Sequence, residues 1–196
     1  MENILFKISY PAEFHAQSAV EAALALHGDV RERIDDIAEI VITTHEGAIR
    51  IIDKRGPLNN PADRDHCLQY MVAVPLLFGR LTAADYEDDV ARDPRIDQLR
   101  SKMTVTEQVQ FSRDYLDPAK RSIANAVEIV MNDGSRLGPV TVEYPVGHRR
   151  RRQEGEPLLM AKFERNLALR FAPRQQAAIL EATSTRPGWR TCPCRH

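Results

Sequence analysis

The chain has 196 residues, enough for one medium-sized domain or for one domain with part of another. Hydrophobic residues make up 43% and charged residues 28%, which is typical of a folded protein with a polar surface. The formal net charge of −1 provides no overall attraction to nucleic acid or to an anionic membrane. No apolar run approaches the roughly 20 residues of a membrane-spanning helix. The first residues lack a secretion signal, and three cysteines give no disulfide framework, so we expect a cytoplasmic protein.

The first part of the chain predicts a helix, a strand and a longer helix. Apolar residues recur at helical spacing over residues 13–26, and Gly28 should end that helix. Residues 37–44 are rich in β-branched side chains and predict a strand. Asn60 suits an N-cap, so a helix should follow over residues 61–78, with its apolar second half buried.

The second part predicts short helices, a hairpin and two further helices. Thr82 and Asp93 should cap two short acidic helices. The turn sequence at 132–135 should join antiparallel strands at 122–131 and 140–144. A basic loop and two helices are predicted at 147–152, 158–171 and 174–181. This order predicts an α+β fold, with a small antiparallel sheet packed with helices and followed by a helical appendage.

Residue patterns alone assign no chemistry to this fold. There is no Gly-rich phosphate loop, His-Glu-x-x-His pair or nucleophile elbow, and the six histidines are scattered. Cys192 and Cys194 fall short of the four converging ligands of a zinc site, so we expect no metal. The arginines at 149–152 could hold a polyanion, but no aromatic residues accompany them, which favours a solvated loop. Lys7 and His15 lie where a helix begins and could face an anion, although surface positions are favoured.

Several long strings carry a more specific signal. They include Phe6-Lys7-Ile8-Ser9-Tyr10-Pro11-Ala12-Glu13-Phe14-His15, Gly56-Pro57-Leu58-Asn59-Asn60-Pro61-Ala62-Asp63-Arg64-Asp65-His66-Cys67, Pro75-Leu76-Leu77-Phe78-Gly79-Arg80-Leu81-Thr82 and Val142-Glu143-Tyr144-Pro145. Over about residues 1–181 the chain resembles the C-terminal part of the MmgE/PrpD family, which includes 2-methylcitrate dehydratases and cis-aconitate decarboxylases. The resemblance implies a large helical domain and a smaller α+β lid domain, with the substrate site between them.

By this resemblance, residues 1–146 form the lid domain. Residues 147–181 form a loop and helices that would complete an all-helical domain whose N-terminal part is missing from this sequence. That part could come from another chain, and a homodimer is compatible with the sequence. Residues 182–196 depart from the family wording, and we expect an aberrant tail, produced by a frameshift near Ala182 and poorly ordered.

The resemblance also implies an activity, the loss of water from 2-methylcitrate to give 2-methyl-cis-aconitate in propionate catabolism. It implies no cofactor, and only Cys67 lies in the matched region, too few thiolates for an iron–sulfur cluster. Eliminating water from a tricarboxylate requires a base, an acid and cationic partners. We therefore assign Lys7 to a substrate carboxylate and His15 to proton transfer or orientation. The weaker substrate-binding candidates are His45, Arg64 and His66.

Alternative functions remain open at this stage. A related lyase that resembles cis-aconitate decarboxylase is one, although the string at 56–61 favours the methylcitrate branch. A non-catalytic relic or binding module is another, and a nucleic-acid binder is the least favoured. In each lyase case we expect the fragment to be inactive alone, because much of the site would come from the missing helical domain.

Overall fold

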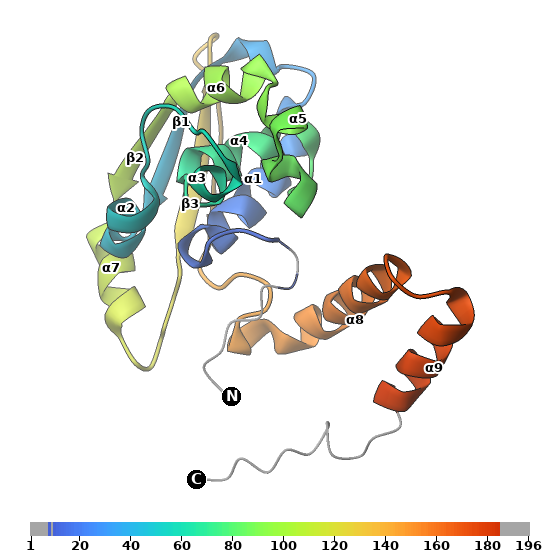
Figure 1. The fold of residues 1–196 in the computed structure, drawn as a ribbon. Coiled ribbons are helices and arrows are strands. Elements are labelled where there is room, and N and C mark those ends of the chain that lie inside the picture. The colour runs from blue at the N-terminus through green and yellow to red at the C-terminus, as the bar shows by residue number, and fades with distance from the viewer. Residues whose placement is uncertain (1–7, 9, 185–196) are drawn as a thin grey trace. The chain divides into compact units, whose positions relative to one another are not determined.

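The computed structural model describes residue 8 and residues 10–184; residues 1–7, 9 and 185–196 lie outside the described part. The chain divides into two compact units (Figure 1). One unit is Tyr10–Pro145, and the other consists of Met1–Ser9 with Val146–His196. No helix among the described residues is long and apolar enough to cross a membrane.

The first unit is built on a four-stranded mixed sheet. Its strands are β1 (Ile37–Thr44), β2 (Met103–Glu107), β3 (Asn125–Met131) and β4 (Arg136–Val142), in the order β2–β1–β3–β4. The predicted strand at 37–44 and the β3–β4 hairpin are confirmed. The predicted α+β fold is confirmed, but the small sheet is mixed rather than antiparallel, because β2 was not predicted and pairs parallel with β1. β2 has only five residues, and only Met103 among them is buried, which hides a short edge strand from pattern analysis.

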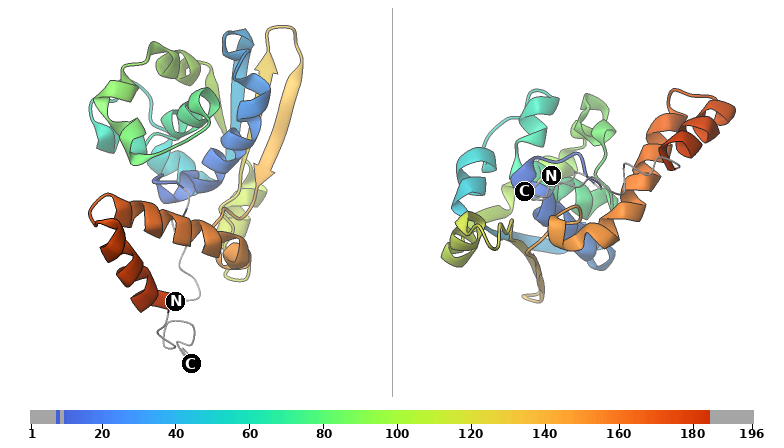
Figure 2. Two further views of the ribbon diagram at one scale, coloured as in Figure 1. Left: turned by 90° about the vertical axis from the view of Figure 1, so that its right-hand side faces the viewer. Right: turned by 90° about the horizontal axis from the view of Figure 1, so that it is seen from below.

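One helix packs on the sheet, and a second helix packs against the first. α1 (Gln17–Val30) lies along β3 and β4, as the left view of Figure 2 shows. α4 (Leu68–Phe78) packs against α1 and, on another side, against α6 (Pro94–Ser101). Every residue from Leu68 to Leu77 is buried, so α4 forms the centre of the unit. The sequence predicted burial of only the second half of the helix at 61–78. The whole of α4 is buried, because neighbours surround it.

Two helix boundaries differ from the predictions. The first helix begins as a 3₁₀ turn, η1 (Phe14–Ala16), and α1 continues past Gly28, because Arg31 N still donates to His27 O at 2.9 Å. The predicted helix at 61–78 is two helices, α3 (Pro61–Asp65) and α4. They separate at Cys67, whose backbone is extended.

Several short elements complete the first unit. They are η2 (Ile34–Asp36), α2 (Glu46–Ile52), η3 (Ala83–Tyr86), α5 (Asp88–Ala91) and α7 (Val109–Leu116). The caps predicted at Thr82 and Asp93 are confirmed, since both precede a helix and accept backbone N–H groups. α2 and α7 were not predicted.

The second unit is helical where it is described. It contains η4 (Arg149–Arg151), α8 (Arg152–Ala168) and α9 (Pro173–Ser184). The arginine run therefore forms a 3₁₀ turn and the start of a helix rather than a loop. Leu158, Leu159 and Phe171 are 45%, 39% and 41% exposed, so this unit carries large apolar side chains on its surface. The tail predicted from Ala182 lies outside the described residues after Ser184.

We predict that the exposed side chains of α8 drive self-association, because they form an apolar patch in water. The double substitution Leu158→Glu/Leu159→Glu should lower the weight-average mass toward the 22.2 kDa of one chain in sedimentation equilibrium. Gln153→Glu, at an exposed polar position of the same helix, adds charge without removing apolar surface and should leave the mass unchanged. A parent chain that is already monomeric at high micromolar concentration would contradict this.

Candidate functional site

The carboxyl ends of the parallel strands β1 and β2 lie at the same end of the sheet, and helices α2 and α7 follow them there (Figure 1). His45 follows β1 directly and is the N-cap residue of α2. Gln108 follows β2, donates its backbone N–H to Thr44 O at 2.8 Å, and leads into α7. Loops at this end of parallel strands commonly carry functional groups. The position of the site therefore depends on the parallel pairing of β1 and β2, which the sequence analysis did not predict.

His15 is held in place by its backbone. The Glu13 carboxylate accepts the His15 backbone N–H at 2.7 Å. Asn125, the first residue of β3, donates its side-chain amide to His15 O at 2.8 Å and to Ser18 Oγ at 2.7 Å. Glu13, which precedes His15, and Asn125, which lies far after it, thus fix the start of α1 on the sheet.

Three aromatic rings meet at this point. His15 Nδ1 and His45 Nε2 are 3.3 Å apart, within hydrogen-bonding distance. The Tyr115 ring from α7 stacks on His45, with 4.5 Å between centroids and 16° between planes, and meets His15 edge-on at 5.4 Å. Stacking of this kind limits the rotation of both imidazoles. We call this group the His15–His45–Tyr115 cluster.

Burial keeps both imidazoles of the cluster neutral. His45 is completely buried and His15 is 6% exposed. Burial, and to a lesser extent the nearby His15, lower the pKa of His45 to about 4. Burial also lowers the pKa of His15, while the Glu13 carboxylate acts in the opposite direction. Near pH 7 the pair therefore carries no charge, and His15 is the member that keeps some exposed surface.

The predicted site residues do not all gather here. His15 and His45 do, whereas Lys7 lies outside the described residues, so its place in the site stays a prediction. Arg64 is buried at a different position, where it donates to Tyr86 O at 2.6 Å and to Asp88 Oδ1 at 2.7 Å. That pairing lowers the pKa of Asp88 and ties α3 to the segment after α4. Arg64 is thus engaged within the fold.

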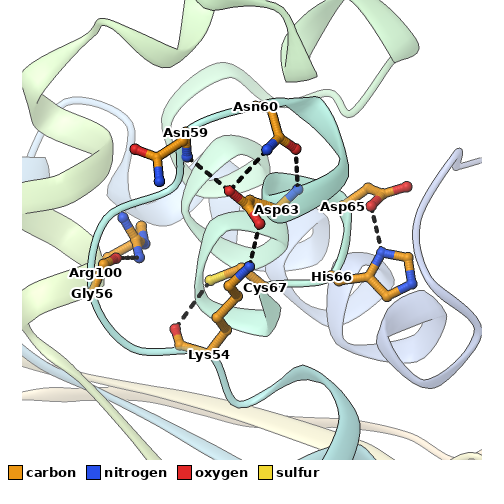
Figure 3. A network of polar contacts seen from close by, with 9 residues as sticks. All are labelled: Lys54, Gly56, Asn59, Asn60, Asp63, Asp65, His66, Cys67 and Arg100. Atoms are coloured by element: carbon orange, nitrogen blue, oxygen red, sulfur yellow. Dashed lines mark hydrogen bonds and ion pairs between the residues drawn. The ribbon is translucent and has the colours of Figure 1, made fainter.

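His66 pairs with Asp65, separately from a polar network around Asp63 (Figure 3). Its Nδ1 is 2.5 Å from Asp65 Oδ1, and its side chain is 55% exposed. Asp63 accepts from Asn59 N at 3.0 Å, from Asn60 Nδ2 at 3.1 Å and from Lys54 Nζ. Hydrogen bonds, chiefly from Lys54, lower the pKa of Asp63. The string at 56–67 therefore folds a loop onto α3, as its capping residues led us to expect.

His45 precedes α2, and a cavity of about 310 Å³ lies near the opposite end of this helix. Its lining residues are Lys54, Arg55, Gly56, Pro57, Gln69, Asp97, Arg100 and Ser101. Each of its three cations has an acidic partner, Asp63, Asp53 and Asp97 in turn. Because these charges are already balanced, the cavity offers little attraction to a polyanion, and we favour the cluster as the candidate site.

Neither Tyr115 nor Asn125 was identified from the sequence. Both lie far along the chain from His15, in segments that carry no motif, and only the fold brings them together. Within residues 8 and 10–184, no group of three or more histidines, cysteines or acids is placed to hold a metal ion.

Comparison with known proteins identifies the family to which the chain belongs. The MmgE/PrpD C-terminal domain matches residues 10–186, which is most of the chain. The chain belongs to the MmgE/PrpD family. Over 93% of its length it is 66% identical to 2-methylcitrate dehydratase from Cupriavidus necator, and over 95% it is 60% identical to 2-methylcitrate dehydratase from Salmonella typhimurium. A relative in Yarrowia lipolytica, 57% identical over 94% of this chain, is named a mitochondrial 2-methylcitrate dehydratase.

The chain spans less than half of the length of these relatives. The chain spans 38% of the Cupriavidus protein, 39% of the Salmonella protein and 36% of the Yarrowia protein. What it shares with them is the C-terminal portion of a 2-methylcitrate dehydratase.

We predict that the capping contact at Asn60 stabilises the loop around Asp63. Asn60 Oδ1 accepts from Asp63 N at 2.9 Å, so Asn60→Ala should reduce the free energy of unfolding by about 1 kcal/mol in urea titrations. Asn59→Ala is the matched control, since Asn59 contributes its backbone N–H and keeps it after substitution. Equal losses from the two substitutions would contradict this role.

We also predict that the cluster makes stability depend on pH. The folded pKa of His45 is about 4 and the ordinary value is 6.5, so between these values the unfolded chain binds a proton that the folded chain does not. The free energy of unfolding should therefore fall as pH falls through this window, by about 1.4 kcal/mol per pH unit for each proton. Urea titrations from pH 4 to 7 measure the slope. His45→Gln should reduce it, and an unchanged slope in this variant would refute the assignment.

Proposed function

We propose that this chain is the C-terminal part of a hydro-lyase that removes water from 2-methylcitrate, giving 2-methyl-cis-aconitate in propionate catabolism. The observation that carries the proposal is the 66% identity to a 2-methylcitrate dehydratase across nearly the whole chain. Identity at this level extends through the strands and helices that position the candidate site. We further propose that the chain requires the portion that the longer relatives possess in addition.

The site supports this need for a second portion. Removing water from a tricarboxylate requires cationic groups for the carboxylates and a base for the proton. The described cluster supplies two neutral imidazoles and a phenol, with no cation among its rings. We assign the cationic role to Lys7 and to residues of the portion that the longer relatives have in addition. The exposed apolar residues of α8 give that portion a surface on which to pack.

The remaining expectations belong to this proposal. The substrate is a small tricarboxylate, no cofactor is invoked, and the partner is a helical domain on the same or another chain. The cytoplasmic location and the homodimer stay predictions.

Complementation tests the proposed function. The 196-residue chain should show no loss of water from 2-methylcitrate when assayed alone, by absorbance of the conjugated product. Addition of the N-terminal portion of the Cupriavidus dehydratase should restore activity, because the shared site is then complete. In the complemented enzyme His15→Gln should lower kcat by about 10²-fold or more. Arg31→Gln, on an exposed side chain, should leave kcat unchanged.

Two results would contradict the proposal. Rapid turnover by the unaided chain would mean that no second portion is required. No turnover after mixing, with binding between the two polypeptides demonstrated by sedimentation, would favour a non-catalytic relic or binding module instead.

A further inference from the structure

The two nitrogens of His45 lie in different surroundings. Nε2 faces His15 Nδ1 at 3.3 Å, and either atom could be the donor. Nδ1 is buried and has no hydrogen-bond partner. A neutral imidazole carries its proton on one of these two nitrogens, and the hydrogen bond made by one decides the state of the other.

Only two neutral arrangements keep the His15–His45 hydrogen bond. In the first, His45 Nε2–H donates to His15 Nδ1, and His45 Nδ1 is a lone pair. In the second, His15 Nδ1–H donates to His45 Nε2, and His45 must then carry an N–H at Nδ1 with no acceptor. Buried N–H groups without an acceptor are rarer than acceptors that lack a donor. This difference favours the first arrangement.

The surroundings of His45 Nδ1 also favour a lone pair. His45 is the N-cap residue of α2, whose first-turn N–H groups are donors and form the positive end of the helix. Gly47 packs beside this nitrogen, since a Cβ at Gly47 would lie 3.2 Å from Nδ1 and 3.4 Å from Cε1. An N–H at Nδ1 would therefore be closely packed without an acceptor, near the positive end of the helix.

The same geometry opposes a charged pair. A proton added to His45 fills Nδ1. A proton added to His15 at Nδ1 can keep the hydrogen bond only if His45 moves its own proton to Nδ1. Every protonated state of the hydrogen-bonded pair thus places an N–H at the one nitrogen without an acceptor. The first neutral arrangement is the state that this packing selects.

We propose that His45 is a positioning residue that holds His15 in the tautomer with its proton on Nε2. In that state neutral His15 offers a hydrogen-bond donor, and no lone pair, at the nitrogen that does not face His45. Tyr115 keeps the two rings aligned through its contacts with both.

This tautomer defines what His15 can do in the reaction, a step that rests on the proposed function. A neutral Nε2–H suits an oxygen of a polycarboxylate, either a carboxylate or the hydroxyl that leaves. It does not suit removal of a proton from carbon, which needs a lone pair. Of the roles assigned to His15, proton transfer or orientation, this excludes proton abstraction as the base and favours orientation of the substrate.

Imidazole ¹⁵N chemical shifts measure the tautomers directly. In the ¹⁵N-labelled 196-residue chain near pH 7.5, two-bond ¹H–¹⁵N spectra should show Nε2 protonated and Nδ1 unprotonated for both His15 and His45. His27 is an internal reference for the opposite tautomer, because its Nδ1 lies 2.9 Å from Leu76 O, which can only accept. Protonated Nδ1 atoms in His15 and His45 would overturn the proposal.

Two variants separate positioning from packing. His45→Gln keeps an amide donor in place of Nε2–H and should preserve the Nε2–H tautomer of His15. His45→Phe keeps a buried ring without a donor and should give His15 a mixture of tautomers. An unchanged His15 spectrum in His45→Phe would overturn the role of His45. If this variant does not fold, the parent spectrum still decides.

The outcome is independent of dehydratase activity. Tautomers as proposed, in a chain that is inactive after complementation, would sink the proposed function alone. Activity after complementation with the reverse tautomers would sink the present inference alone.

Discussion

The hydrogen bond between the buried imidazoles of His15 and His45 is the interaction on which the candidate site depends. It joins the residue after β1 to the turn before α1, and Tyr115 from α7 closes the group on another side. Asn125 at the start of β3 secures the same turn through its backbone. Four segments distant in sequence are thus fixed around one pair of nitrogens. Because both rings are buried, the pair is neutral, and its geometry selects which nitrogen of His15 carries a proton.

A second polar group, around Asp63, has a different purpose. Its carboxylate collects donors from Asn59, Asn60 and Lys54 and closes the loop between α2 and α3. Arg64, in the same string, connects α3 to the segment after α4. The most distinctive sequence string of the chain therefore contributes mainly to the fold, while the chemically versatile pair lies elsewhere. A distinctive sequence string can therefore mark a loop that needs specific residues to fold, and not only a reactive site.

Much of the architecture follows from local sequence. The strand at 37–44, the hairpin around Asn132–Ser135 and the caps at Asn60 and Asp93 were predicted because each rests on neighbouring residues. The parallel strand β2 and helix α7 were missed, because a short polar edge strand and a short surface helix are determined by packing at a distance. The site shows the same division. His15 was identified through the family resemblance, but its partnership with His45 and Tyr115 depends on β1–β2 pairing, which no local pattern encodes.

A crystal structure of the chain, at a resolution that shows the orientation of imidazole rings, tests the central claim most directly. We expect His15 Nδ1 and His45 Nε2 in hydrogen-bonding contact, with Tyr115 stacked on His45 and no water between the two nitrogens. Rings turned apart, or an ordered water that separates them, would contradict a directly bonded neutral pair and the site built on it.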